Sequence, residues 1–226
     1  SGCRLLQRQR HAVEIEVHHQ PGLGAGELHH RAALVGQHHR LRAADDRGTG
    51  RIYIAKPSPG GSDPKRTSFT YYAGATRLAE TAAANTKNRS HSIEADITLP
   101  EKGGEGVLVA IGGSSGGYSL YVQDGKLVYH FNWFDEVRTV ITSSEPVPAG
   151  KSTVRFDFAY DGKSGELGNG GTGSLFINDK KVGEARIEKT VPGRFGIDTF
   201  GVGMDTGSPV SNTYKPPFAF TGTIHE

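Results

Sequence analysis

The sequence has little of what would give a protein covalent cross-links, membrane affinity or affinity for nucleic acid. Its 226 residues include one cysteine, Cys3, which excludes an internal disulfide. The formal net charge is only +2, so no strong attraction to nucleic acid or to an anionic membrane is expected. No stretch of the sequence approaches the roughly 18 consecutive apolar residues that cross a bilayer. We therefore expect neither nucleic acid nor a membrane among the partners.

Apolar residues are also scarce, at 35% of the chain, whereas glycine is abundant, with 32 residues. Many short strands joined by glycine-rich turns produce this balance. No stretch shows the apolar stripe of an amphipathic helix. The composition therefore favours an all-β protein, with one large domain or two small ones.

The clearest local pattern is a β-hairpin within residues 112–132. Asp124 and Gly125 form a strong two-residue turn signal, because a type I′ turn needs a positive φ at both central positions. On either side of this turn, residues 118–123 and 126–131 alternate with a period of two, which is typical of strands.

Similar patterns recur along the rest of the chain. Residues 91–99 alternate cleanly, which predicts a strand with one buried face. A second hairpin is predicted from residues 174–177 and 182–187, after a glycine-rich loop at 161–172. Roughly ten short strands without a helix predict an antiparallel β-sandwich. The other expected strands are residues 68–72, 107–111, 137–142, 152–160, 200–204 and 218–224.

Residues 1–55 differ sharply in composition from the rest. Histidine doublets stand at 18–19, 29–30 and 38–39, whereas Phe, Asn and Lys are missing. Paired histidines are typical of a metal-binding tract, and a basic segment with few large apolar residues is typical of disorder. The missing residue types have AT-rich codons, so out-of-frame translation of GC-rich DNA is a third hypothesis. The only apolar alternation in this segment is too short to predict a strand, and consists of Val13, Ile15 and Val17.

These shifts divide the chain into three parts. Residues 1–55 are interpreted as a disordered or out-of-frame segment rich in histidine and arginine. Residues 56–89 are interpreted as a proline-rich linker followed by an irregular connection. Residues 90–226 are predicted to form the β-sandwich domain.

Five stretches of the sequence carry a resemblance to a known family: residues 41–47, 71–77, 85–90, 106–132 and 205–222. Through them, the chain from about residue 41 onward resembles the C-terminal region of bacterial arylsulfatases of the alkaline-phosphatase superfamily. That resemblance implies a concanavalin-like (jelly-roll) β-sandwich that follows a catalytic domain. Ala73 departs from the family, which usually has proline there. Before residue 41 the family has an acidic helical stretch instead of the histidine-rich segment.

The resemblance covers only the part of the family that follows the active site. Sulfatases use a divalent cation and a formylglycine, which is made from Cys or Ser in a Cys/Ser-x-Pro-x-Arg motif. Cys3 is followed by Arg-Leu-Leu, so it does not match this motif. We therefore predict no catalytic residue, no metal ligand and no cofactor in this chain. The expected partner is the sulfatase catalytic domain, on which this module would dock.

A carbohydrate-binding module is the alternative function. Sugar sites combine exposed aromatic rings with amide and carboxylate groups, and the stretch after the central hairpin has this composition. Large aromatic residues more often pack in the core or against a neighbouring domain, and that interpretation is favoured for Trp133 and Phe134. His130 is expected to be an ordinary histidine on the sheet surface. The candidate binding residues are Asn132, Trp133, Phe134 and Asp135.

Overall fold

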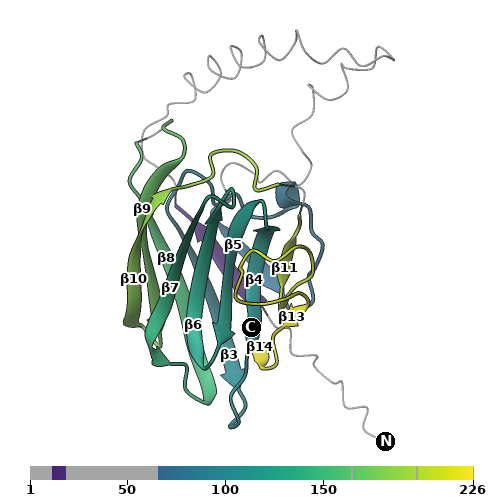
Figure 1. The fold of residues 1–226 in the computed structure, drawn as a ribbon. Helices are drawn as coiled ribbons and strands as arrows, with labels where there is room; N and C mark the ends of the chain where they lie inside the picture. Colours follow the sequence, from purple (N-terminus) through teal and green to yellow (C-terminus); the bar gives the residue numbers. More distant parts are fainter. Residues whose placement is uncertain (1–11, 19–65, 164, 197, 226) are drawn as a thin grey trace, which may run out of the picture.

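The computed structural model describes residues 12–18, 66–163, 165–196 and 198–225. Over these residues the chain forms two β-sheets of seven strands each and one short 3₁₀ helix, η1 (Glu80–Ala82). All pairings between the long strands are antiparallel. The prediction of an all-β antiparallel sandwich is confirmed (Figure 1).

The first sheet, here called the β3 sheet, has the order β10–β9–β8–β3–β1–β2, and β14 also pairs with β3. Its central strand is the predicted residue range 91–99, and the inward side chains of this strand are buried. The strands are β1 (Ala12–Val17), β2 (Ser68–Tyr72), β3 (His91–Leu99), β8 (Gly150–Tyr160), β9 (Asn169–Ile177), β10 (Lys180–Lys189) and β14 (Thr223–His225).

The second sheet, here called the β5 sheet, has the order β12–β13–β4–β5–β6–β7, and β11 also pairs with β4. Its centre is the predicted hairpin, in which Asp124 and Gly125 have φ angles of 51° and 72°. Both angles are positive, as a type I′ turn requires. The strands are β4 (Gly106–Gly113), β5 (Gly116–Gln123), β6 (Lys126–Trp133), β7 (Val137–Pro146), β11 (Phe200–Val202), β12 (Met204–Asp205) and β13 (Phe218–Ala219).

The main core lies between the two sheets. The rings of Tyr129 from β6 and Phe156 from β8 stack with their centres 3.5 Å apart and their planes at 8°. Both side chains are buried, as are their neighbours Leu120 and Leu175. Because each strand directs every second side chain toward the other sheet, the period-two patterns of the sequence converge on this one core.

β1 lies in the segment interpreted above as disordered or out-of-frame, so that interpretation needs correcting for residues 12–17. The strand is inserted between β2 and β3, and Val13, Ile15 and Val17 are buried. Three alternating apolar residues are a weak local signal, but two neighbouring strands supply hydrogen bonds and apolar contacts. β1 and β2 both precede residue 90, so the sandwich is not confined to residues 90–226. The remainder of residues 1–55 lies outside the described residues, apart from His18.

The predicted loop at residues 161–172 is shorter than expected, because β9 begins at Asn169. A Cβ atom on Gly171 would lie 2.3 Å from the Ala159 carbonyl oxygen, and one on Gly173 would lie 2.7 Å from Ile141. These glycines therefore lie in a strand and allow neighbouring parts of the chain to approach closely, rather than forming a loop. The second hairpin is also tighter than predicted, with only Asn178 and Asp179 in its turn.

The segment between β12 and β13 (residues 206–217), here called the C-terminal segment, covers part of the outer face of the β5 sheet. It lies in front of β4 and β5 in Figure 1. Val210 and Tyr214 pack there on outward residues of the strands, forming a second, smaller apolar cluster with Val107, Ala110, Tyr121 and Val128. This face of the β5 sheet is therefore partly enclosed by the chain itself.

Candidate functional site

The four candidate binding residues lie together at the turn between β6 and β7. Phe134 and Asp135 have φ angles of 52° and 61°, so both occupy the left-handed region. Asn132 stabilises this turn, because its side-chain oxygen accepts a hydrogen bond of 2.9 Å from the backbone N–H of Asp135. The structure places these four residues on one turn, but their individual roles differ.

Asn132 is fully buried and its polar atoms are already used within the fold. Its side-chain nitrogen donates to the carbonyl oxygens of Gly113 and Ser114, both at 2.9 Å. A buried amide with all these partners is costly to redirect toward a ligand. Asn132 therefore holds the β4–β5 turn against the β6–β7 turn.

Asp135 is exposed, but its carboxylate is paired within the chain. One guanidinium nitrogen of Arg138 lies 2.5 Å from Asp135 Oδ1, and another donates to the Val210 carbonyl oxygen at 2.7 Å. Arg138 thus links the β6–β7 turn to the C-terminal segment. The pair orders this end of the sheet and leaves Asp135 less available to a sugar hydroxyl.

The two aromatic residues form a contact pair with different exposures. The rings of Trp133 and Phe134 meet edge to face, with their centres 5.2 Å apart. Trp133 packs partly against the main core, and Lys189 Nζ lies 4.9 Å from the centre of its ring. Phe134 is 43% exposed. Trp133 therefore supports Phe134 from beneath by packing between it and the main core.

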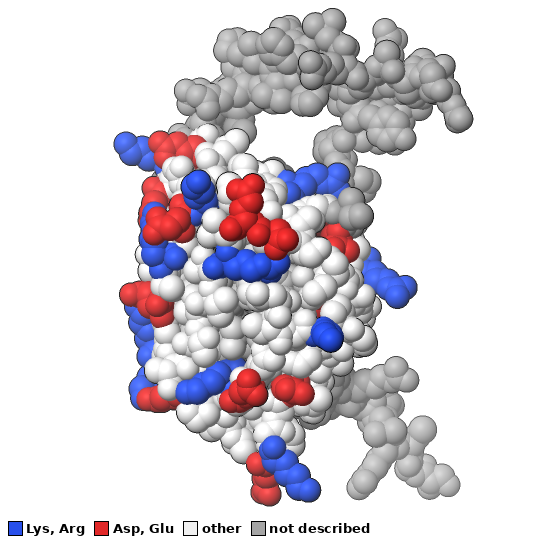
Figure 2. Space-filling model, viewed as in Figure 1, with Lys and Arg blue, Asp and Glu red and all other residues white. Residues whose placement is uncertain are grey.

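Two further exposed apolar residues lie on the adjacent strand β7, namely Val137 and Val140. Figure 2 views the molecule from the side of the β5 sheet. Charged side chains gather toward the two ends of the strands and along the edge of the molecule formed by β9 and β10, and the surface between them is largely uncharged. The sequence did contain a signal for an outward apolar residue, because Val140 and Ile141 are neighbours and must face opposite sides of a strand. Val137 is opposite Trp133 in the β6–β7 pairing, and Phe134 contacts the Trp133 ring, whereas Val140 points to the other side of β7. We call Phe134 and Val137 the β6–β7 apolar surface.

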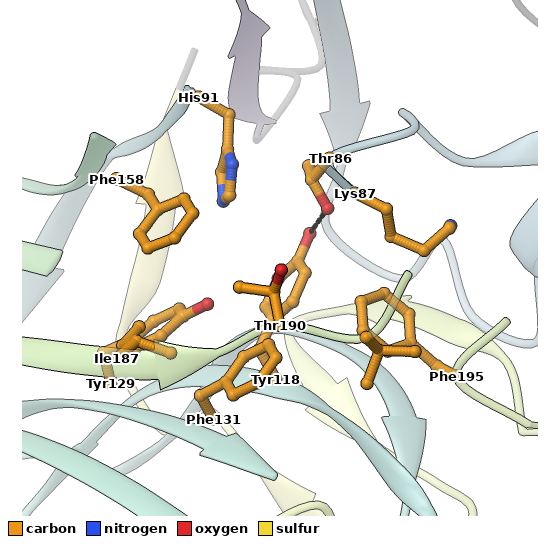
Figure 3. Close-up of a pocket in the computed structure, with 11 residues that line it drawn as sticks. Thr86, Lys87, His91, Tyr118, Tyr129, Phe131, Phe158, Ile187, Thr190 and Phe195 are labelled. Carbon is orange, nitrogen blue, oxygen red and sulfur yellow. Dashed lines mark hydrogen bonds between the residues drawn. The ribbon is translucent and has the colours of Figure 1, made fainter. Parts of the chain in front are cut away.

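A second candidate is a small cavity between the sheets, shown in Figure 3. Its volume is about 20 Å³, which is room for about one water molecule. The polar groups at its wall are the Tyr118 hydroxyl, which lies 3.5 Å from Thr86 Oγ1, and the ring of His91. Lys87, also at the wall, is paired with Glu80 at 2.6 Å. A sugar or a sulfate ester does not fit in this space.

Two titratable groups of this cavity, His91 and Tyr118, are held in their neutral forms. Burial lowers the pKa of His91 to about 4, although its Nδ1 lies 3.2 Å from the Arg89 carbonyl oxygen. Burial also raises the pKa of Tyr118 above its ordinary value. At neutral pH neither side chain is charged, so the cavity is a packing defect of the core rather than an acid–base site.

His130 is not the surface histidine that the sequence predicted. It faces outward from β6 as expected, but it is fully buried, and neither ring nitrogen has a hydrogen-bond partner. Burial lowers its pKa to about 4, and the charge of Arg138 acts in the same direction. The prediction failed because a strand pattern does not show which outward positions another segment will cover.

The segment that follows β12 is fixed by a buried polar network. Asp205 accepts a hydrogen bond of 2.7 Å from the Tyr214 hydroxyl, and Ser119 Oγ on β5 lies within hydrogen-bond distance of the same hydroxyl oxygen, at 3.1 Å. The backbone N–H of Val210 donates to the same Asp205 carboxylate oxygen. Asp205, Val210 and Tyr214 lie within residues 205–222, and their role here is to hold this segment on the sheet.

We next consider a metal site and a membrane-crossing helix in the part of the chain that the structure describes. Within residues 12–18, 66–163, 165–196 and 198–225, no group of three or more His, Cys, Asp or Glu side chains is placed to share a metal ion. No helix among these residues is long and apolar enough to cross a membrane.

Comparison with known proteins gives structural similarity only. The mouse laminin α1 chain, domains LG4-5, has 13% sequence identity and a TM-score of 0.44, with 67% of this chain and 37% of the laminin chain covered. A heptameric SAP-like pentraxin from Limulus polyphemus has 13% identity and a TM-score of 0.39, with 62% of each chain covered. The chain thus spans less than two thirds of either protein. No protein-family model and no curated protein matches the sequence. The fold itself defines the class, an all-β sandwich of two sheets.

Proposed function

We propose that this β-sandwich is a non-catalytic module that docks on the catalytic domain of an arylsulfatase-type hydrolase and supports it. The β6–β7 apolar surface carries this proposal. Phe134 and Val137 are each more than 40% exposed, and both lie beside Trp133 where β6 turns into β7. Exposed apolar groups of this kind mark interaction surfaces more often than ligand sites that need polar contacts.

The sequence stretches that resemble the sulfatase family support the identity of the partner. Residues 106–132 and 205–222 meet on the β5 sheet, where the Tyr214 hydroxyl lies within hydrogen-bond distance of Ser119 Oγ. The second stretch also contacts the turn that presents Phe134, through the bond between Arg138 and the Val210 carbonyl oxygen. The resembling stretches therefore build the support beneath the proposed docking surface.

Carbohydrate binding remains the second candidate, because Phe134 and Asp135 are exposed beside each other on one turn. The polar partners that a sugar would need are mostly engaged, since Asn132 is bonded within the fold and Asp135 is paired with Arg138. These contacts favour docking over sugar binding.

The two candidates separate in one pair of measurements on the purified chain. Docking predicts concentration-dependent self-association in sedimentation velocity, because the surface lacks its partner, and a reduction by Phe134→Ser. Leu167→Ser is the matched control, because Leu167 is 65% exposed but lies outside this surface. Sugar binding instead predicts a monomer whose Trp133 fluorescence changes on addition of oligosaccharides, and that result would refute docking.

We also expect the chain to have no arylsulfatase activity by itself, because its resemblance to the family covers only the part that follows the active site. Residues 62–66 read Ser-Asp-Pro-Lys-Arg and fit the letters of the formylglycine motif, but they belong to the proline-rich linker. The assay is hydrolysis of an aryl sulfate with added calcium or magnesium. Heat-sensitive turnover above the buffer blank would contradict the proposal.

A further inference from the structure

Two separate segments share one edge of β3. β14 pairs with residues 96–98 of that strand, and β1 pairs with residues 91–95. Both are antiparallel to β3, so they run in the same direction, end to end. Together they complete the pairing of β3 opposite its other neighbour, β8.

The two registers continue without a gap. His225 is opposite Asp96, and Val13 is opposite Ala95, the next residue along β3. Ile224 and Val13, Ile15 and Val17 are all buried on the core side. β1 therefore occupies a position that any strand of matching alternation would fill, whether or not it is joined to its neighbours by a tight turn.

The outward side of β1 fits its position poorly. Glu14 is directly opposite Glu94 in the β1–β3 pairing, and like charges in such pairs are destabilising. Glu14, Glu16, Glu94 and Asp157 line one groove with Ser92 and Arg155. Arg155 is shared among Glu94, Asp157 and Asp179, at 3.4, 3.3 and 2.9 Å, so it does not compensate the glutamates of β1.

The covalent connection of β1 is also unlike that of the other long strands. β5 and β6, or β9 and β10, are joined by two-residue turns, whereas residues 18–67 connect β1 to β2. A longer connection raises the entropic cost of closing the pair. β1 is thus held mainly by its hydrogen bonds and by its buried apolar side chains.

We propose that the β1 position is a strand-acceptor site for an extended segment of a partner polypeptide. This segment has β-branched apolar residues at alternating inward positions and lysine or arginine at the outward positions now held by Glu14 and Glu16. It forms the same backbone hydrogen bonds as β1, as in other cases of strand addition, and it pairs favourably with Glu94 and Asp157. β1 is the resident strand that it displaces.

The test uses the full chain and three synthetic peptides. The first peptide is residues 11–19 with Glu14→Lys and Glu16→Lys. The second is residues 11–19 unchanged. The third is the lysine peptide with Val13→Asn, Ile15→Asn and Val17→Asn added. Peptide binding is followed by fluorescence anisotropy, and amide hydrogen exchange of the chain is followed by mass spectrometry. The lysine peptide should bind about tenfold more tightly than the unchanged one, and the asparagine peptide should not bind.

Displacement has its own signature in hydrogen exchange. With the lysine peptide bound, the amides of residues 13–17 in the chain should lose protection, while the amides of β3 stay protected. Failure of the lysine peptide to bind would overturn the proposal. Equal binding of the asparagine peptide would also overturn it, because that would show charge attraction without strand insertion. A dimer that exchanges β1 between two copies, and that the peptides do not dissociate, would assign the site to a second copy instead.

Discussion

The outer faces of the two sheets are built from the same alternating pattern, yet they meet different surroundings. On the β3 sheet, the outward side chains form an ion-pair network in which Arg155 contacts three carboxylates. On the β5 sheet, outward residues such as Tyr121 and Val128 are apolar and lie beneath the C-terminal segment. The difference teaches that alternation alone sets only which side chains share a face. The chemistry of the outward set decides whether that face meets solvent, the chain itself or a partner.

The largest change in stability is expected when the packing of the C-terminal segment on the β5 sheet is disrupted. Tyr214→Ala should lower the free energy of unfolding by about 3–5 kcal/mol, because it deletes a buried ring together with its hydrogen bonds to Asp205 and Ser119. The matched variant on the opposite face is Phe176→Ala. That ring is only partly buried, beneath the Arg155 guanidinium, so its loss should cost about 1 kcal/mol.

Denaturant unfolding of both variants measures this difference. Similar losses of stability in the two variants would contradict the account, because they would show that the C-terminal segment contributes no more than a solvent-exposed face does.

The second expected effect depends on pH. Burial lowers the pKa of His130, and that of His91, to about 4, from an ordinary value of about 6.5. The unfolded chain therefore binds protons more readily than the folded chain, so stability is lost as the pH falls from about 6.5 through about 4. Both histidines are buried without a partner for Nε2, so neither has a hydrogen bond there that would favour the charged form.

The pH dependence distinguishes the histidine on the outer face of the β5 sheet from the histidine between the two sheets. His130→Leu should reduce the slope of unfolding free energy against pH by removing the histidine under the C-terminal segment, and His91→Leu should do so from between the sheets. Unfolding is followed at several pH values between 4 and 8. An unchanged slope in His130→Leu would show that this histidine reaches solvent.

A smaller effect is expected on the charged face. Glu14→Lys should raise the free energy of unfolding by about 0.5–1 kcal/mol, because it replaces the like-charged pair with Glu94 by an opposite-charged one. Glu16→Lys is the control, since Glu16 is opposite the neutral Ser92 and should gain less. Thermal unfolding at low and high salt measures both variants. Equal gains, independent of salt, would argue against a specific cross-strand interaction.

Much of the fold could be predicted from the sequence, because alternation and turn chemistry are local signals. The residue range of β3 matched, and the Asp124–Gly125 turn has the predicted positive φ angles. β1 was missed because three alternating apolar residues become a strand only when β2 and β3 lie on either side. The start of β9 was missed because its glycines permit close chain approach, a requirement that only the packed structure reveals.

The contacts of the candidate binding residues could not be predicted from the sequence. The sequence placed an aromatic and polar group at residues 132–135, and the structure brings these residues together on one turn. That Asn132 is consumed by Gly113 and Ser114 depends on a contact between separate turns, which no local pattern encodes. The burial of His130 depends in the same way on the distant segment 205–214.

The most direct test of the docking proposal is binding to a catalytic domain. The partner is a bacterial arylsulfatase that carries the stretches 106–132 and 205–222 in its own C-terminal region, produced without that region. Titration calorimetry should show saturable binding of this chain. Phe134→Ser with Val137→Ser should weaken that binding by about tenfold or more, whereas Leu167→Ser should leave it unchanged. No binding by the unaltered chain, or equal binding by all three proteins, would contradict the claim that the β6–β7 apolar surface docks on a sulfatase catalytic domain.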